Sequence, residues 1–323
     1  MLAALVGIWW ARGERPPVAG GWFRDSGLEL ASVMIDEHAV RYVRTGSGSA
    51  VLLVHGFGSS VYTWRDAIPV LAEDYEIIGL DLPGFGSSDR PPSLSFRELV
   101  NATSGLLDRL GVGQVSVVGN SLGGGVAAAL AALEPERVQR LVLIDSIGFQ
   151  HGVEDAPLLL RLVTSPTWGP IFARLPLKRA SARLALRQVF HDDAFVTDER
   201  VEEYAAPWFR PGTAPAVRSL FRADPQQWLW LRDSIQSIRV PTLVIWGAED
   251  TWIPVEHARL FEAAIPDSHV EILDACGHMP QEECSGRVST LLRAFLALAD
   301  TTTAAIAATP ASPPQSVPRA PET

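Results

Sequence analysis

A serine flanked by glycines is the first feature of the sequence that could do chemistry. Ser121 lies at the centre of the segment "GNSLG" (residues 119–123), which has the pattern G-x-S-x-G. The apolar run "VSVV" precedes the pattern and the alanine-rich segment "GGVAAALAAL" follows it, so we expect a strand that turns directly into a helix. The residue at the tip of so tight a turn is strained, and glycines two residues away avoid collisions. The pattern therefore favours an exposed nucleophilic serine over a serine that only caps a helix.

A serine hydroxyl is a weak nucleophile unless a histidine takes its proton, and a carboxylate usually orients that histidine. His278, in "DACGHMPQEE", follows the apolar run "HVEILD" (269–274) and is the candidate base. Two carboxylates also stand at the ends of apolar runs. Asp250 follows "TLVIWG" (242–247) and Asp145 ends "RLVLID" (140–145). We favour Asp250 as the orienting residue and keep Asp145 as the alternative.

Attack on a carbonyl also requires hydrogen-bond donors for the developing oxyanion. One donor is expected to be the backbone N–H of Leu122, the residue after the serine. The second is expected from the glycine-containing loop "HGFGSS" (55–60), where the N–H of Phe57 is the best candidate. We interpret His55, at the start of this loop, as a structural residue and not as a second base.

These residues must be positioned by a sheet. Short apolar runs alternate with segments of helical character, which is typical of a parallel sheet buried on both faces. Two further runs, Leu28–Ile35 and Ala39–Thr45, are too close together for an intervening helix and predict an antiparallel hairpin at the sheet edge. The expected strands are 50–56, 76–82, 115–119, 140–145, 242–247 and 269–274, and the clearest helical segments are 95–110, 121–133, 255–265 and 282–298.

The alternation stops between about residues 146 and 239. A structureless loop of that length is improbable in a compact domain, so we expect a helical insertion over the carboxyl ends of the strands. The sequence thus divides into an apolar, irregular N-terminal segment (1–21), a first core part (22–145), a helical cap (146–239), a second core part (240–299) and a disordered Thr/Ala/Pro-rich tail (300–323).

Composition limits the remaining functions. The chain has 323 residues and a formal net charge of −10, which argues against nucleic-acid partners. The two cysteines, Cys276 and Cys284, match no metal-ligand spacing, and we expect two free thiols in a reducing compartment rather than a disulfide. We expect no metal and no cofactor.

The apolar N-terminus "MLAALVGIWW" is too short to span a bilayer and lacks the basic start of a signal peptide. A cytoplasmic location is expected, with peripheral membrane contact through this segment as the alternative.

Taken together, "HGFGSS", "DLPGFGSSDRP", "GNSLGG", "WGAEDTWIP" and "CGHMPQEE" stand in the order and at the spacings of the α/β-hydrolase superfamily. The sequence resembles this family over roughly residues 30–298. The resemblance implies an α/β fold with a mostly parallel eight-stranded sheet and a helical cap inserted after the sixth strand. It also implies a triad of Ser121, Asp250 and His278, with the N–H groups of Phe57 and Leu122 as the oxyanion hole.

The resemblance leaves three functions to compare. The main expectation is a serine hydrolase that cleaves carboxylic esters of fairly apolar small molecules through an acyl-enzyme. The segment "GNSLGG", with Asn120 before the serine, is similar to the same segment of the meta-cleavage-product hydrolases. Those enzymes cut carbon–carbon bonds in dienone acids and carry an arginine in the cap that binds the substrate carboxylate. Here Arg187 or Arg210 could serve. Met279 after His278 and the loop "HGFGSS" depart from that group. The third function is a binding protein of this fold without activity. The oligomeric state is not readable from the sequence.

Overall fold

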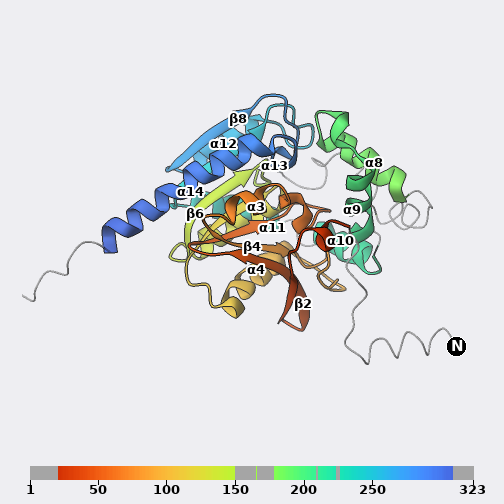
Figure 1. Cartoon of the computed structure of the whole chain (residues 1–323), viewed down its shortest axis with the longest axis horizontal. Coiled ribbons are helices and arrows are strands. Elements are labelled where there is room, and N and C mark those ends of the chain that lie inside the picture. The colour runs from red at the N-terminus through yellow and green to blue at the C-terminus, as the bar shows by residue number, and fades with distance from the viewer. Residues whose placement is uncertain (1–20, 150–164, 166–177, 209, 223–225, 308–323) are drawn as a thin grey trace, which may run out of the picture.

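An eight-stranded sheet forms the centre of the protein (Figure 1). The structure is a computed structural model that describes residues 21–149, 165, 178–208, 210–222 and 226–307. The strand order is β1-β2-β4-β3-β5-β6-β7-β8. The first two strands form an antiparallel hairpin, β2 pairs antiparallel with β4, and all other pairs are parallel. The strands are β1 (Leu30–Ile35), β2 (His38–Gly46), β3 (Ala50–Val54), β4 (Glu76–Asp81), β5 (Val115–Asn120), β6 (Val138–Ile144), β7 (Thr242–Gly247) and β8 (Ser268–Leu273). The predicted fold class is confirmed.

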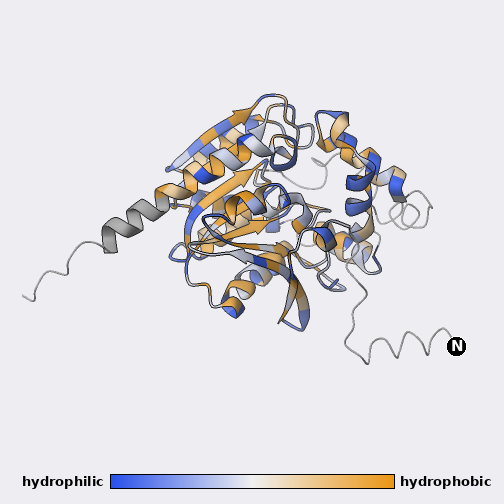
Figure 2. Ribbon diagram, in the orientation of Figure 1, coloured by the Kyte–Doolittle hydropathy of each residue, from blue (hydrophilic) through white to orange (hydrophobic). Residues whose placement is uncertain are grey.

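Successive residues of the central strands enter two separate apolar layers. Leu52 and Val117 pack in the layer that holds α4 (Phe96–Leu110), α5 (Leu122–Leu133) and α12 (Glu256–Ala264). Their chain neighbours Leu53 and Val118 pack in the opposite layer, with α3 (Ala67–Leu71) and α14 (Ser285–Ala307). Side chains alternate across a strand, so a sheet covered on both faces needs continuous apolar runs. The runs appear as orange strands in Figure 2.

Local signals fix the start and end of the helices in the core. The Ser95 hydroxyl oxygen accepts a hydrogen bond from the Glu98 N–H, and the Ser95 N–H donates one to the Glu98 carboxylate, which is a capping box at the start of α4. The same helix ends at Gly111, whose φ of 69° is left-handed. The segment predicted as one helix over 282–298 is two helices, α13 (Pro280–Glu283) and α14, with Cys284 between them.

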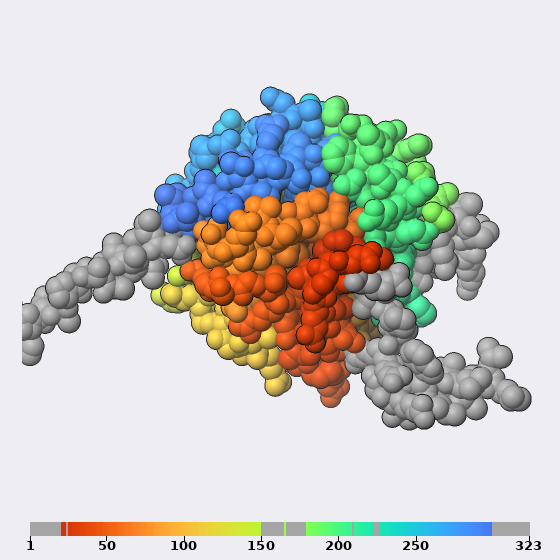
Figure 3. All heavy atoms as spheres, viewed as in Figure 1, coloured from red at the N-terminus to blue at the C-terminus, as the bar shows by residue number. Residues whose placement is uncertain are grey.

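Four described helices lie in the chain between β6 and β7, as expected of an insertion after the sixth strand. They are α8 (Lys178–Val189), α9 (Asp198–Trp208), α10 (Thr213–Arg222) and α11 (Gln226–Gln236), with the 3-10 turn η3 (Asp193–Phe195) after α8. Figure 3 shows α8 and α9 in green against the blue C-terminal part and the red α2 (Gly21–Asp25). The Trp22 N–H donates to Glu203 Oε1 on α9 at 3.1 Å, so α2 is fastened to the insertion.

The sequence predicts irregular structure at both ends of the chain. The helix α14 continues to Ala307, because threonine and alanine without proline can extend a helix whose inner face is already packed. The apolar segment at residues 1–10 lies outside the described residues. Within the described residues, none of the helices combines the length and apolar character needed to cross a membrane.

Candidate active site

Ser121 stands at the junction of β5 and α5 with φ 54° and ψ −117°. A Cβ at Gly119 would lie 2.3 Å from the Gly123 carbonyl oxygen, and a Cβ at Gly123 would lie 2.3 Å from the Val54 carbonyl oxygen. Real Cβ atoms do not approach backbone this closely, so both positions require glycine while the turn keeps this geometry. The turn puts the serine at the carboxyl edge of the parallel strands.

A continuous hydrogen-bonded series joins the three predicted triad residues. His278 Nε2 lies 2.9 Å from Ser121 Oγ, and His278 Nδ1 lies 2.7 Å from Asp250 Oδ2. Asp250 Oδ1 accepts hydrogen bonds from the N–H groups of Trp252 (2.7 Å) and Ile253 (3.0 Å). Ser121 and His278 are 6% and 3% exposed. The structure therefore brings together Ser121, His278 and Asp250 in the geometry that passes a proton from a hydroxyl to an imidazole.

Electrostatics favour an ionised Asp250. Burial alone would raise the pKa of this carboxyl, but the charge of His278 and the hydrogen bonds from His278, Ile253 and Trp252 outweigh burial. The pKa of Asp250 consequently lies below its ordinary value. The Trp252 ring stacks on the His278 ring with centroids 5.4 Å apart, which fixes the plane of the imidazole.

Asp145, the alternative orienting residue, lies next to this series. It follows β6 and is fully buried, and its Oδ1 accepts a hydrogen bond from the Gly247 N–H at 3.0 Å. Burial first, and then the negative charge of Asp250, raise the pKa of Asp145 well above its ordinary value. Ligand atoms of Asp145, Asp250 and His278 lie within 4.8 Å of one another, a spacing that could hold a metal ion. Both ring nitrogens of His278 are already hydrogen-bonded, however, so the arrangement suits proton transfer better.

The loop after β3 approaches the serine. A Cβ at Gly56 would lie 2.8 Å from Asn120 Oδ1 and 3.1 Å from Ser121 Cβ, so glycine lets the backbone that carries the Phe57 N–H come this near without displacing either side chain. His55 donates from Nδ1 to the Gly56 carbonyl at 2.7 Å and accepts the Leu82 N–H at Nε2, 3.0 Å away. Burial lowers the pKa of His55. These contacts give His55 a structural role. The oxyanion role of Phe57 and Leu122 stays a prediction.

Asn120, the residue that suggested carbon–carbon bond chemistry, is buried and points away from solvent. Its Nδ2 donates to the carbonyls of Ile144 (3.1 Å) and His278 (3.3 Å). The side chain thus links β5, β6 and the loop that carries the histidine. In this structure its contacts position the base and do not identify a substrate.

Aromatic side chains from the core and the insertion surround Phe57. The ring centroids of Phe85, Trp208 and Phe221 lie 5.6, 5.2 and 5.3 Å from that of Phe57, each edge to face. Other large apolar residues of the segment 146–239 could also line a substrate pocket. Of these, Trp228 and Trp230 pack instead near Phe96, and Phe190 packs near Phe195. The others lie outside the described residues: Leu158–Leu160, Trp168, Phe172 and Phe209.

The two arginines considered for a substrate carboxylate have other contacts. Arg187 is half-exposed and lies 3.7 Å from Asp193. Arg210 donates to the Gly86 carbonyl at 2.9 Å, beside Arg90, which itself donates to the carbonyls of Gly86 and Pro207. The Arg210 contact therefore joins the insertion to the core, whereas the Arg187 contact lies within the insertion.

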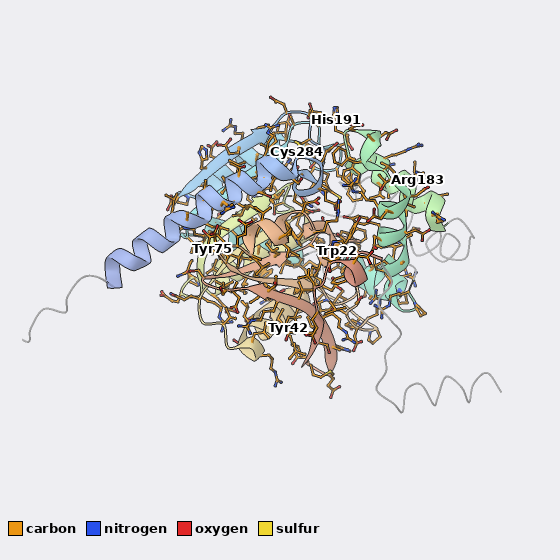
Figure 4. The ribbon with its side chains drawn as sticks, in the orientation of Figure 1. Trp22, Tyr42, Tyr75, Arg183, His191 and Cys284 are labelled. Carbon is orange, nitrogen blue, oxygen red and sulfur yellow. A yellow bond between two sulfur atoms is a disulfide. The ribbon has the colours of Figure 1, made fainter. Side chains whose placement is uncertain are left out.

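Sequence reasoning missed the carboxyl end of α8. The Val189 carbonyl accepts the His278 N–H at 2.7 Å, and the Gln188 carbonyl accepts the Thr251 hydroxyl at 2.7 Å. Glu283 accepts from three backbone N–H groups, those of Gly277 (2.6 Å), His191 (3.1 Å) and Asp192 (2.6 Å). Figure 4 shows His191 and Cys284 in the same part of the molecule, where the chain after α8 meets α13. Backbone carbonyls leave no trace in a sequence, and Glu283, although it ends the segment "CGHMPQEE", gives no sign there of the backbone groups that it contacts.

The expectation of two free thiols is wrong. Cys276 and Cys284 form a disulfide, with Cα atoms 6.2 Å apart. The loop from β8 folds back through the short helix α13, which brings two residues eight positions apart within bonding distance. His278 lies inside the ring that the disulfide closes. The sequence spacing alone could not show this approach.

The chain is similar in sequence and in structure to known proteins. The family model described as "alpha/beta hydrolase fold" matches residues 49–284. The 2-hydroxymuconate semialdehyde hydrolase of Pseudomonas sp. (strain CF600) is 33% identical over 267 residues, which are 79% of this chain and 89% of that protein. The 2-hydroxy-6-oxo-2,4-heptadienoate hydrolase of Pseudomonas putida (strain F1) is 32% identical over 79% and 91% of the two chains. A solved structure of the meta-cleavage product hydrolase CumD from Pseudomonas fluorescens IP01 superposes with a TM-score of 0.71 at 28% identity, covering 83% and 98%.

Proposed function

Because the chain belongs to the α/β-hydrolase fold family, we propose that it is a serine hydrolase of conjugated keto acids that cleaves a carbon–carbon bond. In this proposal Ser121 is the nucleophile, His278 the general base and Asp250 the residue that orients the base. The observation that carries it is the unbroken series of hydrogen bonds from Asp250 through His278 to Ser121 in a chain similar to named meta-cleavage product hydrolases. The substrate class comes from that likeness, which favours it over the ester hydrolase expected from the sequence.

The chemistry can be followed atom by atom. Ser121 Oγ adds to the keto carbonyl while His278 Nε2 takes the hydroxyl proton. The resulting oxyanion is held by the N–H groups of Phe57 and Leu122. When the carbon–carbon bond breaks, its electron pair stays with the fragment that carries the conjugated carboxylate. His278 then gives its proton to that fragment. Water, deprotonated by His278, then cleaves the acyl-serine and releases the second acid.

The surroundings of Phe57 support a flat, conjugated substrate. Phe85, Trp208 and Phe221 place ring edges and faces beside the loop that supplies the second oxyanion donor. Aromatic walls accept planar π-systems by stacking or edge contacts. Trp208 and Phe221 belong to the insertion, so we also propose that residues 146–239 act as the cap over the site.

The test is a comparison of substrates on one preparation of enzyme. We expect kcat/KM for 2-hydroxy-6-oxo-2,4-heptadienoate, followed by loss of its ultraviolet absorbance, to exceed that for p-nitrophenyl acetate, butyrate and octanoate. The Ser121→Ala variant should lose about 10⁴-fold or more in kcat on every substrate that turns over, with unchanged thermal unfolding.

Ester hydrolysis is the competing function, because Met279 follows His278 where meta-cleavage-product hydrolases usually have tryptophan. The same triad would serve it, since only the leaving group changes from a carbanion to an alkoxide. A higher kcat/KM for any of the three esters than for the dienone acid would replace our proposal with the ester hydrolase. Activity that survives in Ser121→Ala would contradict both.

A further inference from the structure

Asp145 is a buried carboxyl group that the proposed mechanism does not use. It follows β6 directly, its solvent exposure is 0%, and its φ is 44°. Oδ1 has one partner, the Gly247 N–H at 3.0 Å. Oδ2 is buried, and no N–H or O–H donor of the described residues reaches it. An ionised carboxylate in this place would leave a charged oxygen without solvent and without a donor.

The neighbour of Asp145 offers no donor either. Carboxyl oxygens of Asp145 and Asp250 and a ring nitrogen of His278 all lie within 4.8 Å of one another. Two ionised carboxylates this close repel each other, and both only accept hydrogen bonds. A hydrogen bond between the Asp145 and Asp250 side chains therefore needs a proton on one of the two groups.

The distribution of donors decides which group carries the proton. Asp250 receives hydrogen bonds from His278, Trp252 and Ile253, and all of them favour its ionised form. Asp145 receives one, from Gly247. Besides Asp250, Glu283 acts on Asp145, and its negative charge also disfavours ionisation of Asp145. Burial works in the same direction.

We propose that Asp145 is a neutral carboxylic acid that donates a hydrogen bond to the Asp250 carboxylate and is a positioning residue of the triad. The proposal rests on the triad roles given above. The Asp145 proton would leave the pair with a single negative charge and would fix the Asp250 carboxylate while its other contacts hold His278. A hydrogen bond to a charged acceptor is among the stronger ones in proteins.

Two substitutions separate the hydrogen bond from the charge. Asp145→Asn keeps the shape, the neutrality and one donor, and asparagine tolerates a positive φ. Asp145→Gly removes the donor without straining the left-handed backbone. The matched control is Val142→Ala, a truncation on the same strand in the opposite apolar layer, which destabilises the protein without touching Asp250.

The readout is the second-order rate of labelling of Ser121 by a fluorophosphonate, measured as a function of pH. This probe reports the reactivity of the serine whatever the natural substrate is. We expect the labelling rate of Asp145→Gly to be about tenfold or more below that of the wild type. Asp145→Asn should label at close to the wild-type rate, and the acid limb of its pH profile should lie at the same pH as in the wild type. Val142→Ala should leave both the rate and the pH profile of the folded protein unchanged.

An ionised Asp145 would give a different profile. Removing its negative charge in Asp145→Asn would take an anion away from the protonated base, and the acid limb of the labelling profile would move to lower pH. Infrared difference spectra between wild type and Asp145→Asn decide the same point without any activity. We expect the wild type to show the carbonyl band of a protonated carboxylic acid at neutral pH, and absence of that band overturns the proposal. A wild type that shows the band but does not react with the probe would contradict the triad and not the proton on Asp145.

Discussion

The backbone of Ser121 is held in a left-handed conformation by its neighbours. Its N–H donates to the Ile144 carbonyl at 2.9 Å, and its carbonyl accepts from Gly125 and Ile147, both at 3.1 Å. Strain of this kind costs on the order of 1–3 kcal/mol and persists only where surrounding contacts over-determine it. At the scale of the residue, three backbone hydrogen bonds therefore hold the strained turn that carries the Ser121 hydroxyl.

The proton assigned to Asp145 has a thermodynamic consequence. In the unfolded chain this carboxyl ionises near its ordinary pKa, whereas the pKa of Asp145 in the fold is raised. Between these two values the folded state binds one proton more than the unfolded state, so stability falls as pH rises, by up to about 1.4 kcal/mol per pH unit. Asp145→Asn lacks this titration. We expect the stability of the variant relative to wild type to increase from about pH 5 to about pH 7.

Urea unfolding at the two pH values measures this difference directly. Titrating groups that do not act on Asp145 are common to both proteins and cancel in the comparison. Asp250, whose pKa is lowered, stays ionised over this pH range in both proteins. A stability difference that stays constant with pH would mean that Asp145 titrates in the fold as it does in the unfolded chain.

Residue types and their places at strand ends were enough to predict which side chains meet. Ser121, Asp250 and His278 each follow an apolar run, and parallel strands bring such positions to one edge. The proton on Asp145 could not be predicted in this way, because it depends on how many donors reach each oxygen. The contacts of the Asn120 amide could not be predicted for the same reason, since its partners are the backbone carbonyls of Ile144 and His278.

At the scale of the elements, α8 supports both the loop that carries Asp250 and the loop that carries His278. Its last two carbonyls accept from Thr251, next to Asp250, and from the N–H of His278 itself. Glu283 joins the turn after α8 to the loop before His278. A second buried carboxylate, Glu282, lies 2.6 Å from Arg65 Nη1 and accepts from the hydroxyls of Thr63 and Tyr204, so it joins η1 (Val61–Trp64), α13 and α9.

Glu283→Ala tests the contact between α8 and the histidine loop. The substitution leaves three backbone N–H groups without their carboxylate acceptor, so we expect a loss of about 2 kcal/mol in the free energy of unfolding. We also expect slower labelling of Ser121, because Gly277 precedes His278 directly. The control is Glu262→Ala, which removes an exposed ion pair with Arg259 and should cost less than about 1 kcal/mol. Equal losses in the two variants would show that the Glu283 contacts contribute nothing specific.

Elements of the sheet were predictable because continuous apolar runs have few alternative structures. The predicted hairpin, the strands and α4 agree with the structure to within a few residues. The prediction of one helix over 282–298 was wrong at Cys284, where α13 ends and α14 begins. A 3.6-residue apolar pattern does not reveal a helix break that a tertiary contact imposes. The contacts between insertion and core were not predictable, since they run through carbonyls and through acidic residues that resemble any surface acid.

At the scale of the whole molecule, the disulfide ties the end of the sheet to the last helix. Cys276 follows β8, Cys284 precedes α14, and the ring between them contains the histidine that both the insertion and the core hold in place. Its removal should therefore affect heat stability and the site together.

Cys284→Ser measures this contribution. For a loop this short, a lost disulfide destabilises a protein by about 2 kcal/mol, and we expect a lower Tm by several degrees. Treatment of the wild type with dithiothreitol should reproduce the loss, and dithiothreitol should leave the Cys284→Ser protein unchanged. If mass spectrometry shows that the reductant has produced two thiols and the Tm of the wild type is unchanged, the disulfide does not contribute to the stability of the fold.

The ring around His278 has a practical consequence for anyone who prepares the protein. A bacterial host with a reducing cytosol would deliver the dithiol, whereas export to an oxidising space or refolding with glutathione would deliver the ring. Two batches with identical sequence and identical mass to within two hydrogen atoms would then tolerate heating and storage differently. Specific activities from separate laboratories become comparable only when the thiol content of each batch is stated.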